Sequence, residues 1–322
     1  MDSRDDVTPK VIKKQATLLD DYYATPNTST LTFLFDSQHC PSIEARLRKS
    51  QIQHASINGK DLYLIDRFFQ PEEGEGMRAF SEGATFSRNS YGSPEAIEQG
   101  EKPARSMNGK ERWQFFARPP KAIQELYKLF SQLGDKLDAE VTTLPWELSD
   151  KASHGSPAVI ANRLEEATET SRELGKHQDC NPSGRISFGV PVLYAPELRF
   201  HPAQFVNGEE GKPWLISAML YTTAPRFLPQ YQLGTVFYDD QHNLVLRSNC
   251  HNMRIVLFAG DILHSIEESL IPPGEDLWRI SYVFKLIVNP KRAGHDLKTS
   301  LANYLKSLTP IEQMTLGPLA RG

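Results

Sequence analysis

Apolar residues follow two different spacings along this chain, one typical of helices and one typical of strands. The clearest helical spacing lies at 121–141, where apolar positions recur every three or four residues and so share one face. Pro119 and Pro120 stand directly before it, where proline is tolerated, and Gly134 weakens its middle by about 1 kcal/mol relative to alanine. We therefore predict a helix with one buried face, made of Ile123, Leu126, Tyr127, Phe130, Leu133 and Leu137.

The rest of the N-terminal half has weaker patterns. Residues 1–30 are polar and are expected to be loosely ordered or to form a short helix. Apolar runs at 31–35 and 61–69 predict two strands, and an acidic turn, PEEGEG, is expected directly after the second at 71–76. Residues 81–120 are rich in Gly, Ser, Asn and Pro, which predicts long loops.

Short β-rich runs dominate the sequence after about residue 155, and turn-forming residues separate most of them. The runs are PAVIANRL (157–164), RISFGVPVLY (185–194), PWLISAMLYTT (213–223), GTVFYDD (234–240), NLVLRS (243–248), RIVLFAG (254–260) and WRISYVFKLIV (278–288). Several short strands at close spacing predict a β-sandwich or barrel. A last helix is expected at LKTSLANYLKSL (297–308).

These patterns predict an α+β fold in four parts. A polar segment (1–30) precedes an α/β region (31–150) that packs on a double-sheet β core (151–292), and a C-terminal helix and tail (293–322) follow. A chain of 322 residues is long enough to bury a large core in one or two domains.

Charge, cysteine content and hydrophobic runs indicate the expected compartment and the expected classes of partner. The net charge of -4 gives no global reason to expect a nucleic-acid partner, and no apolar run approaches the ~20 residues of a membrane span. Three scattered cysteines, Cys40, Cys180 and Cys250, imply no disulfide framework. The first residues lack the apolar stretch of a signal peptide, so we expect a cytoplasmic protein, or a nuclear one in a eukaryotic host.

Two histidines and one aspartate form the first candidate site. His177 and Asp179 are two residues apart, so on an extended chain both side chains point to the same face. His264 follows a buried strand and a Gly-Asp turn. Two histidines and a carboxylate on one side of a metal are typical of non-haem iron oxygenases. A His-x-Asp pair by itself is weak evidence for a metal site, because His and Asp also pair as ordinary hydrogen-bond partners.

The second candidate site is Arg279 with Ser281, again two residues apart on one face of a predicted strand. An arginine in an apolar strand is unfavourable unless it meets an anion, and its planar group suits a carboxylate. A serine hydroxyl beside it can donate another hydrogen bond. The alternative is an arginine that reaches the barrel rim or pairs with a structural Asp or Glu.

Taken in order, these pieces resemble the Fe(II)/2-oxoglutarate oxygenase superfamily, especially its prolyl-4-hydroxylase-like branch. The resemblance covers about 155–290, and more weakly 61–73. It implies a double-stranded β-helix (a jelly-roll, cupin-like core) with iron bound by His177, Asp179 and His264. It also implies that Arg279 pairs with the distal carboxylate of 2-oxoglutarate, assisted by Ser281 and Tyr221. The implied cofactors are Fe(2+), 2-oxoglutarate and O2, with ascorbate as an optional reductant.

The sequence also departs from the family pattern. Asp179 and His264 are 85 residues apart, and the excess, at 187–213, looks like an insertion. Leu164 stands where many members carry tyrosine. Related halogenases lack the carboxylate, so the presence of Asp179 favours hydroxylation or oxidative demethylation.

Four functions remain open from the sequence. The favoured one is a dioxygenase that hydroxylates a protein or peptide residue, proline included, with release of succinate and CO2. An AlkB-like nucleic-acid demethylase is the second, although Lys285 and Leu164 replace its late arginine and its tyrosine. A small-molecule or amino-acid hydroxylase is the third. The fourth is a non-enzymatic cupin-like metal-binding protein, which would have no use for Arg279 and Ser281.

Two other clusters have a structural interpretation that we favour. Residues 102–121 hold six basic residues against one acid, with interleaved aromatics Trp113, Phe115 and Phe116. Such a loop could bind nucleic acid or an acidic peptide or cover a substrate, but a solvated loop anchored by its aromatics is expected. His39-Cys40 and Cys250-His251 lack zinc-finger spacing and are expected to be surface residues. The sequence does not predict an oligomeric state.

Overall fold

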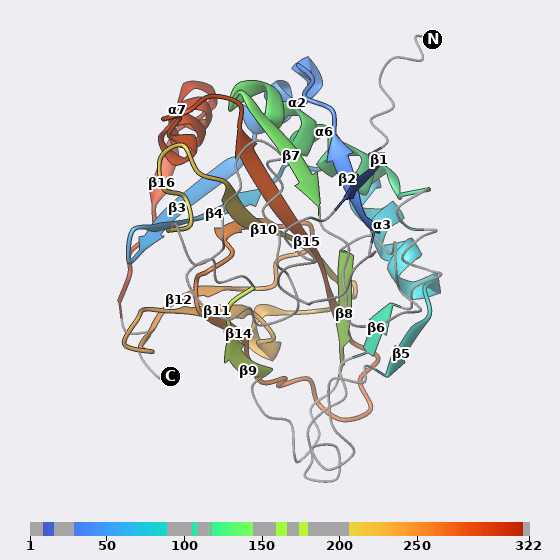
Figure 1. Cartoon of the computed structure of the whole chain (residues 1–322). Helices are drawn as coiled ribbons and strands as arrows, with labels where there is room; N and C mark the ends of the chain where they lie inside the picture. The colour runs from blue at the N-terminus through green and yellow to red at the C-terminus, as the bar shows by residue number, and fades with distance from the viewer. Residues whose placement is uncertain are drawn as a thin grey trace.

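The computed structural model describes residues 9–15, 29–88, 105–107, 115, 118–143, 159–165, 174–179 and 206–317. Within these residues the fold is mixed α/β, rich in sheet, with few helices (Figure 1). The helices are α2 (Pro41–Leu47), α3 (Pro71–Gly83), α6 (Lys121–Lys136) and α7 (Leu297–Leu308), with a short 3-10 turn, η2 (Pro229–Tyr231). No helix among the described residues is long and apolar enough to cross a membrane.

Two sheets contain the described strands. The main path of the large sheet runs β1 (Lys10–Gln15), β2 (Ser29–Phe35), β7 (Ala139–Thr143), β15 (Arg279–Pro290), β10 (Trp214–Thr223), β13 (Ile255–Ala259), β4 (Lys60–Asp66), β3 (Gln51–Ile57), β16 (Ile311–Gln313). A branch from β15 adds β8 (Val159–Leu164), β6 (Arg105–Met107) and β5 (Phe86–Arg88). The small sheet is β12 (Leu244–Ser248), β11 (Thr235–Tyr238), β14 (His264–Ile266) and β9 (Leu174–His177). All pairs are antiparallel except β16 with β3.

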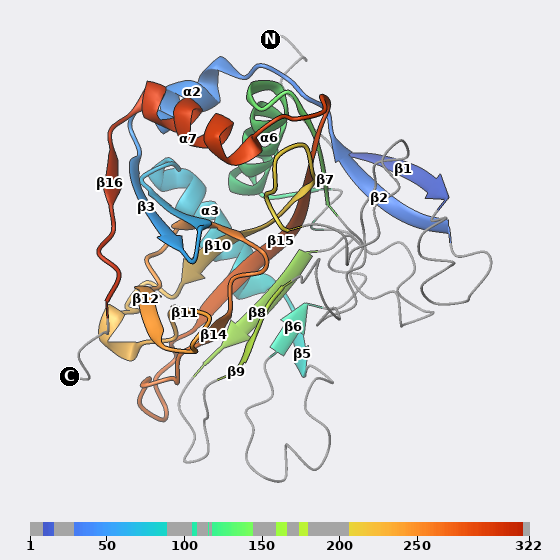
Figure 2. The ribbon, with the colours of Figure 1, turned by 60° about the vertical axis from the view of Figure 1, so that its left-hand side comes forward.

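Strand β15 is the centre of the molecule, and both of its faces are covered. Tyr282 bonds to Ser81 of α3, and Phe284 packs edge-on against Tyr127 and Phe130 of α6, so these residues face the helices. Side chains alternate along a strand, so the odd-numbered residues of β15 face the small sheet instead. Figure 2 shows this layering, with helices over one side of the large sheet and the small sheet over the other.

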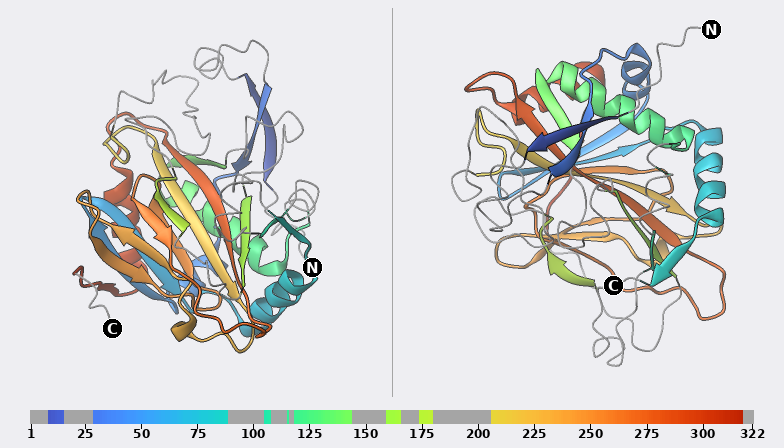
Figure 3. Two further views of the ribbon diagram at one scale, coloured as in Figure 1. Left: turned by 90° about the horizontal axis from the view of Figure 1, so that it is seen from below. Right: turned by 45° about the vertical axis from the view of Figure 1, so that its right-hand side comes forward.

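The two sheets pack face to face around an interior that is partly polar. The rings of Phe237 on β11 and Phe258 on β13 lie 5.2 Å apart between centroids. Tyr221 on β10 donates its hydroxyl to Thr235 Oγ1 on β11 at 2.7 Å. Figure 3 shows the two sheets from below and in a view turned by 45° about the vertical axis. Polar groups buried between sheets need partners or a ligand, so this interior is where a site is expected.

The predicted helix at 121–141 is confirmed over Lys121–Lys136, and its six predicted core residues are all buried. Its predicted end is wrong. Asp138 has a positive φ of 44°, and the chain then continues as β7. Tertiary pairing decides this boundary, because Val141 lies opposite Val288 of β15 and Phe35 of β2. As a strand, 139–143 satisfies backbone groups by pairing with β15 along its length and with β2 at 141–143.

Gly134 is required by close packing. A Cβ there would lie 2.8 Å from Ser37 Oγ and 3.3 Å from the carbonyl oxygen of Ala139. We expect Gly134→Ala to lower the free energy of unfolding by about 1 kcal/mol, because overpacking outweighs the gain in helix propensity. Chemical denaturation measures the change. In a Ser37→Ala background the same substitution should be neutral or stabilising; stabilisation in the wild type would contradict this account.

Other segments differ from the predictions for identifiable reasons. The acidic segment at 71–76 begins helix α3 rather than forming a turn, because Pro71 starts it and Glu73 accepts the backbone N–H of Gln70 at 2.9 Å. Residues 10–15 form strand β1, not a loose segment or helix. The run at 185–194 lies outside the described residues.

Strand β3 was not predicted, although the sequence contains a sign of it. Asn58-Gly59 joins β3 to β4 with φ angles of 51° and 75°, and Ile57 lies opposite Lys60. Asn-Gly between two apolar runs is the strongest short-range sign of a β-hairpin. The hairpin joins the same sheet as β10, β13 and β15, so the large sheet takes strands from both sides of residue 150.

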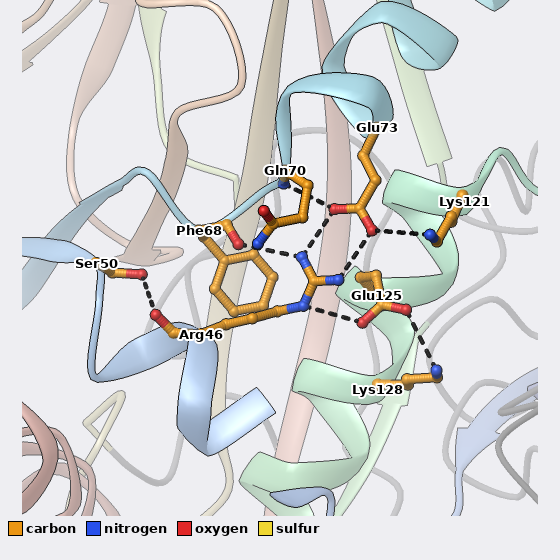
Figure 4. Close-up of polar contacts among 8 residues, drawn as sticks. All are labelled: Arg46, Ser50, Phe68, Gln70, Glu73, Lys121, Glu125 and Lys128. Atoms are coloured by element: carbon orange, nitrogen blue, oxygen red, sulfur yellow. Dashed lines mark hydrogen bonds and ion pairs between the residues drawn. The ribbon is translucent and has the colours of Figure 1, made fainter. Parts of the chain in front are cut away.

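A buried charge network joins helices α2, α3 and α6 (Figure 4). Arg46 donates two hydrogen bonds to Glu73, at 2.7 and 2.8 Å, and its Nε lies 3.3 Å from Glu125. Lys128 lies 3.2 Å from Glu125, and Lys121 lies 3.7 Å from Glu73, whose side chain is 0% exposed. Burial alone would raise the pKa of Glu73, but the hydrogen bonds and charge of Arg46 lower it below its usual value.

Candidate metal centre

The structure brings His177, Asp179 and His264 together. His177 ends β9, Asp179 follows two residues later, and His264 begins β14 directly opposite His177 in the sheet register. One possible ligand atom from each residue lies within 4.8 Å of the others. In the part of the chain that the structure describes, this is the one group of three or more such residues.

The carboxylate lies between the two imidazoles. Asp179 Oδ1 is 3.8 Å from His177 Nε2 and 3.8 Å from His264 Nε2. Asp179 and His264 are buried, while the His177 side chain is 26% exposed. The ring of Phe258 lies 4.9 Å from that of His264 and shields it from the core side. The group is therefore accessible from the side of His177.

His264 has the tautomer that a metal ligand needs. Its Nδ1 lies 2.9 Å from the carbonyl oxygen of Ile262, and a carbonyl can only accept, so Nδ1 carries the proton. The lone pair is then on Nε2, which faces Asp179. Burial lowers the pKa of His264 to about 4, although the charge of Asp179 acts in the opposite direction. At neutral pH the ring is uncharged and able to donate its lone pair to a metal.

Two residues of the large sheet hold the Asp179 carboxylate. Ser217 of β10 donates a hydrogen bond to Oδ2, and the ammonium group of Lys285 of β15 contacts Oδ1. Ser217 and Lys285 lie directly opposite each other in the register of β10 and β15. Burial would raise the pKa of Asp179, but Lys285 and then the two histidines hold it well below its usual range. The carboxylate is therefore ionised.

Lys285 was not predicted as a site residue from the sequence. It was noted only as the residue that stands where AlkB-like proteins carry a late arginine. A signal was available, because Lys285 lies six residues after Arg279 and therefore on the same face of the strand. Its contact with Asp179 depends on the pairing of two sheets, which strand periodicity alone does not reveal.

Arg279 is a fully buried cation with spare hydrogen-bonding capacity. Its side chain is 0% exposed, so it does not reach the barrel rim. Nε donates to Cys250 Sγ at 3.3 Å, Nη1 donates to Ser281 Oγ at 3.0 Å, and Nη2 has no hydrogen-bond partner among the described residues. No carboxylate contacts Arg279 within the described ranges. A buried guanidinium without an anion is unfavourable, so this corner fits an anionic ligand.

Tyr221 lies against Arg279. Its ring is 4.9 Å from the guanidinium carbon, which is a cation–π contact, and its hydroxyl is donated to Thr235. Tyr221 therefore supports the arginine through its ring. Its expected assistance in binding the distal carboxylate of 2-oxoglutarate stays a prediction.

The secondary candidates are structural or lie outside the described residues. Phe115 is buried and stacks on Tyr282 with centroids 5.2 Å apart, as expected of an aromatic anchor; Trp113 and Phe116 lie outside the described residues. Cys40 and Cys250 are buried, so their expected surface position was wrong. Cys250 is buried because its thiol fits between Arg279 and the carbonyl of Leu233.

Comparison with known proteins gives only distant structural matches. No family model matches the sequence, and no curated protein matches it either. Solved structures that match include a prolyl hydroxylase from Trichoplax adhaerens in complex with a peptide fragment of the hypoxia inducible factor oxygen degradation domain. It is 11% identical, with a TM-score of 0.36, and the match covers 81% of this chain and 91% of that chain. A prolyl-4-hydroxylase from Pseudomonas putida is 9% identical, with a TM-score of 0.30, and the match covers 78% and 98%. The function of this protein is therefore inferred from its own residues.

Proposed function

We propose that this protein is an Fe(II)- and 2-oxoglutarate-dependent dioxygenase. One observation carries the proposal: a His-Asp-His group lies in the same fold as a buried arginine, Arg279, that has no carboxylate partner among the described residues. His177, Asp179 and His264 would bind iron, and Arg279, assisted by Ser281, would bind the distal carboxylate of 2-oxoglutarate. Strand β15 connects the two ends of this site, because it carries both Arg279 and Lys285.

The order of the strands supports a double-stranded β-helix for the core within 151–292. From β8 to β15, the large sheet contains β8, β15, β10 and β13 as neighbours, and the small sheet contains β9, β14, β11 and β12. The chain therefore passes repeatedly between the two sheets, which is how a double-sheet jelly roll is built. In this proposal residues 31–150 extend and cover the core.

The donor set fits a divalent iron ion. Asp179 is ionised and His264 is neutral, so both have a lone pair ready, and three ligands on one side leave positions open. Iron bound here would supply O2 activation coupled to the conversion of 2-oxoglutarate to succinate and CO2, which drives oxidation of a substrate C–H bond. Ser217 and Lys285 orient the carboxylate, and Phe237 and Phe258 keep water away from His264.

Succinate release from 2-oxoglutarate, measured with Fe(II) and O2 and including turnover without substrate, tests the proposal. We expect release that depends on both iron and the enzyme. A cupin-like binding protein would bind metal without binding 2-oxoglutarate. Absence of both turnover and 2-oxoglutarate binding would therefore reject the oxygenase.

Arg279→Leu is expected to weaken 2-oxoglutarate binding by about 100-fold or more, because it removes one member of a buried charge pair. Metal affinity should remain unchanged, since Arg279 has no contact with the three ligands. Isothermal titration of 2-oxoglutarate measures the change, and Arg226→Leu, at an exposed arginine, serves as the control. Ser281→Ala should weaken binding several-fold in a protein that keeps its buried arginine. Unchanged 2-oxoglutarate affinity in both site variants would contradict the assignment.

The proposed substrate is a protein or peptide residue, with proline as the first candidate. This choice rests on the resemblance of the sequence to the prolyl-4-hydroxylase-like branch. Peptide libraries incubated with the enzyme and analysed by mass spectrometry would reveal the gain of one oxygen atom. Salt-dependent binding of single-stranded oligonucleotides would instead favour the nucleic-acid demethylase, and turnover of free amino acids would favour the small-molecule hydroxylase.

A further inference from the structure

Gln178, which lies between the candidate ligands His177 and Asp179, forms a hydrogen bond to the turn that precedes His264. Its Nε2 donates to the backbone oxygen of Asp261 at 2.8 Å. Asp261 lies three residues before His264, in the turn between β13 and β14. This hydrogen bond connects the segment of His177 and Asp179 to the segment of His264.

The carboxylate of Asp261 is itself the centre of a buried network. Asn207 donates to Asp261 Oδ1 at 2.8 Å, and Lys60 Nζ lies 3.3 Å from Oδ2. Lys60 also donates to the backbone oxygen of Asp261 at 3.0 Å. Asp261 and Asn207 are only 7% and 5% exposed, so the hydrogen bond between them is shielded from solvent. The β3–β4 hairpin, through Lys60, thus supports the turn before His264.

The same network holds the start of β10. Asn207 makes two hydrogen bonds to the backbone of Leu215, accepting its N–H at 2.8 Å and donating to its oxygen at 3.0 Å. The N–H of Gly260, next to Asp261, donates to the same Leu215 oxygen at 2.9 Å. Two residues further along β10 is Ser217, which holds the Asp179 carboxylate.

We propose that Asp261 is a positioning residue of the metal centre. Its backbone oxygen accepts a hydrogen bond from Gln178, which lies between His177 and Asp179. Its carboxylate binds Asn207, which in turn holds β10, the strand that carries Ser217. Its own turn leads to His264. Asp261 contacts none of the three ligands. Its role is to set the distance between the ligand pair and the third ligand. This inference rests on the proposed metal site and adds to it the residues that fix its geometry.

Groups that orient metal ligands without touching the ion typically change metal affinity by 10- to 100-fold when they are removed. We expect Asp261→Ala and Gln178→Leu each to weaken Co(II) binding by about that factor. Both should also shift the visible absorption bands of bound Co(II), because those bands report ligand geometry. Asp261→Asn keeps the acceptor for Asn207 and should give an intermediate effect. A general loss of stability would lower the melting temperature without moving the bands.

Asp66→Asn is the matched control. Asp66 makes a partly buried pair with Arg254, at 2.6 and 2.9 Å, in the same large sheet, but it bonds to no segment that carries a ligand. It should lower thermal stability and leave the Co(II) affinity and spectrum unchanged. If Asp261→Ala does not fold, Asp261→Asn decides for the carboxylate, and Gln178→Leu tests separately the hydrogen bond to the backbone oxygen of the turn.

The outcomes separate the two proposals. Wild-type protein that binds no Co(II) would reject the metal site and this inference with it. Wild-type binding that Asp261→Ala and Gln178→Leu leave unchanged in affinity and spectrum would overturn the positioning role alone. Weaker Co(II) binding with shifted absorption bands in Asp261→Ala and Gln178→Leu, and neither change in Asp66→Asn, would support the positioning role.

Discussion

Asp179→Ala is expected to reduce succinate production to the rate seen without enzyme. Asp179 is the one carboxylate of the three-residue group and lies 3.8 Å from both histidine Nε2 atoms. Without it, two imidazoles remain beside the ammonium group of Lys285, whose charge Asp179 no longer offsets. A positive charge next to the site repels a divalent cation. Fe(II) binding and succinate release should therefore be lost together.

The controls for this prediction separate loss of metal from loss of fold. Asp179→Asn keeps the size of the side chain and a hydrogen-bond acceptor for Ser217, and it should lose activity in the same way. Asp276→Ala, at an exposed position, should retain full turnover. Thermal unfolding shows whether each variant is folded. Retained turnover in folded Asp179→Ala would exclude Asp179 as a ligand.

Arg46→Leu is expected to lower the free energy of unfolding by about 3–5 kcal/mol, which is typical when one partner of a buried ion pair is removed. Glu73 would lose its two hydrogen bonds to Arg46 while its side chain stays fully buried, and Glu125 would lose a cation (Figure 4). Helices α2, α3 and α6 would lose their shared charge network. Chemical denaturation at neutral pH measures the change.

The pH dependence of this effect has a defined sign. In the wild type the pKa of Glu73 is lowered, so its contribution to stability is present above its unfolded pKa of about 4.3 and is lost as the pH falls through the folded value. In Arg46→Leu, burial without the arginine should raise that pKa, so the variant should lose stability as the pH rises through it. The difference between wild type and variant should therefore shrink between pH 7 and pH 4.

A double variant identifies the cause. Arg46→Leu with Glu73→Met replaces the pair by apolar groups, and it should recover much of the stability that the single variant loses. Turnover should follow folding in all of these variants, because the network bonds to none of the candidate ligands. A loss below about 1 kcal/mol in the single variant, the usual range for exposed pairs, would contradict the structural role.

Local spacing in the sequence was enough to predict several features. Three- and four-residue spacing predicted helix α6 and its buried face, and apolar runs predicted strands such as β4, β10 and β13. The two-residue spacing of His177 and Asp179 predicted that they share a face, and the same spacing linked Arg279 with Ser281. These are properties of neighbouring residues on one element, so they depend only on the geometry of that element.

Tertiary structure alone decided which elements meet. Residues 139–143 form a strand rather than the end of the predicted helix, because β15 pairs with all of them and β2 pairs with 141–143. Lys285 contacts Asp179, and Gln178 binds the turn at Asp261, only because β9, β14 and β15 come together from distant parts of the chain. Periodicity states which way a side chain faces along its own strand. Strand order and register determine what it faces, and those follow from the burial and hydrogen bonding of the whole fold.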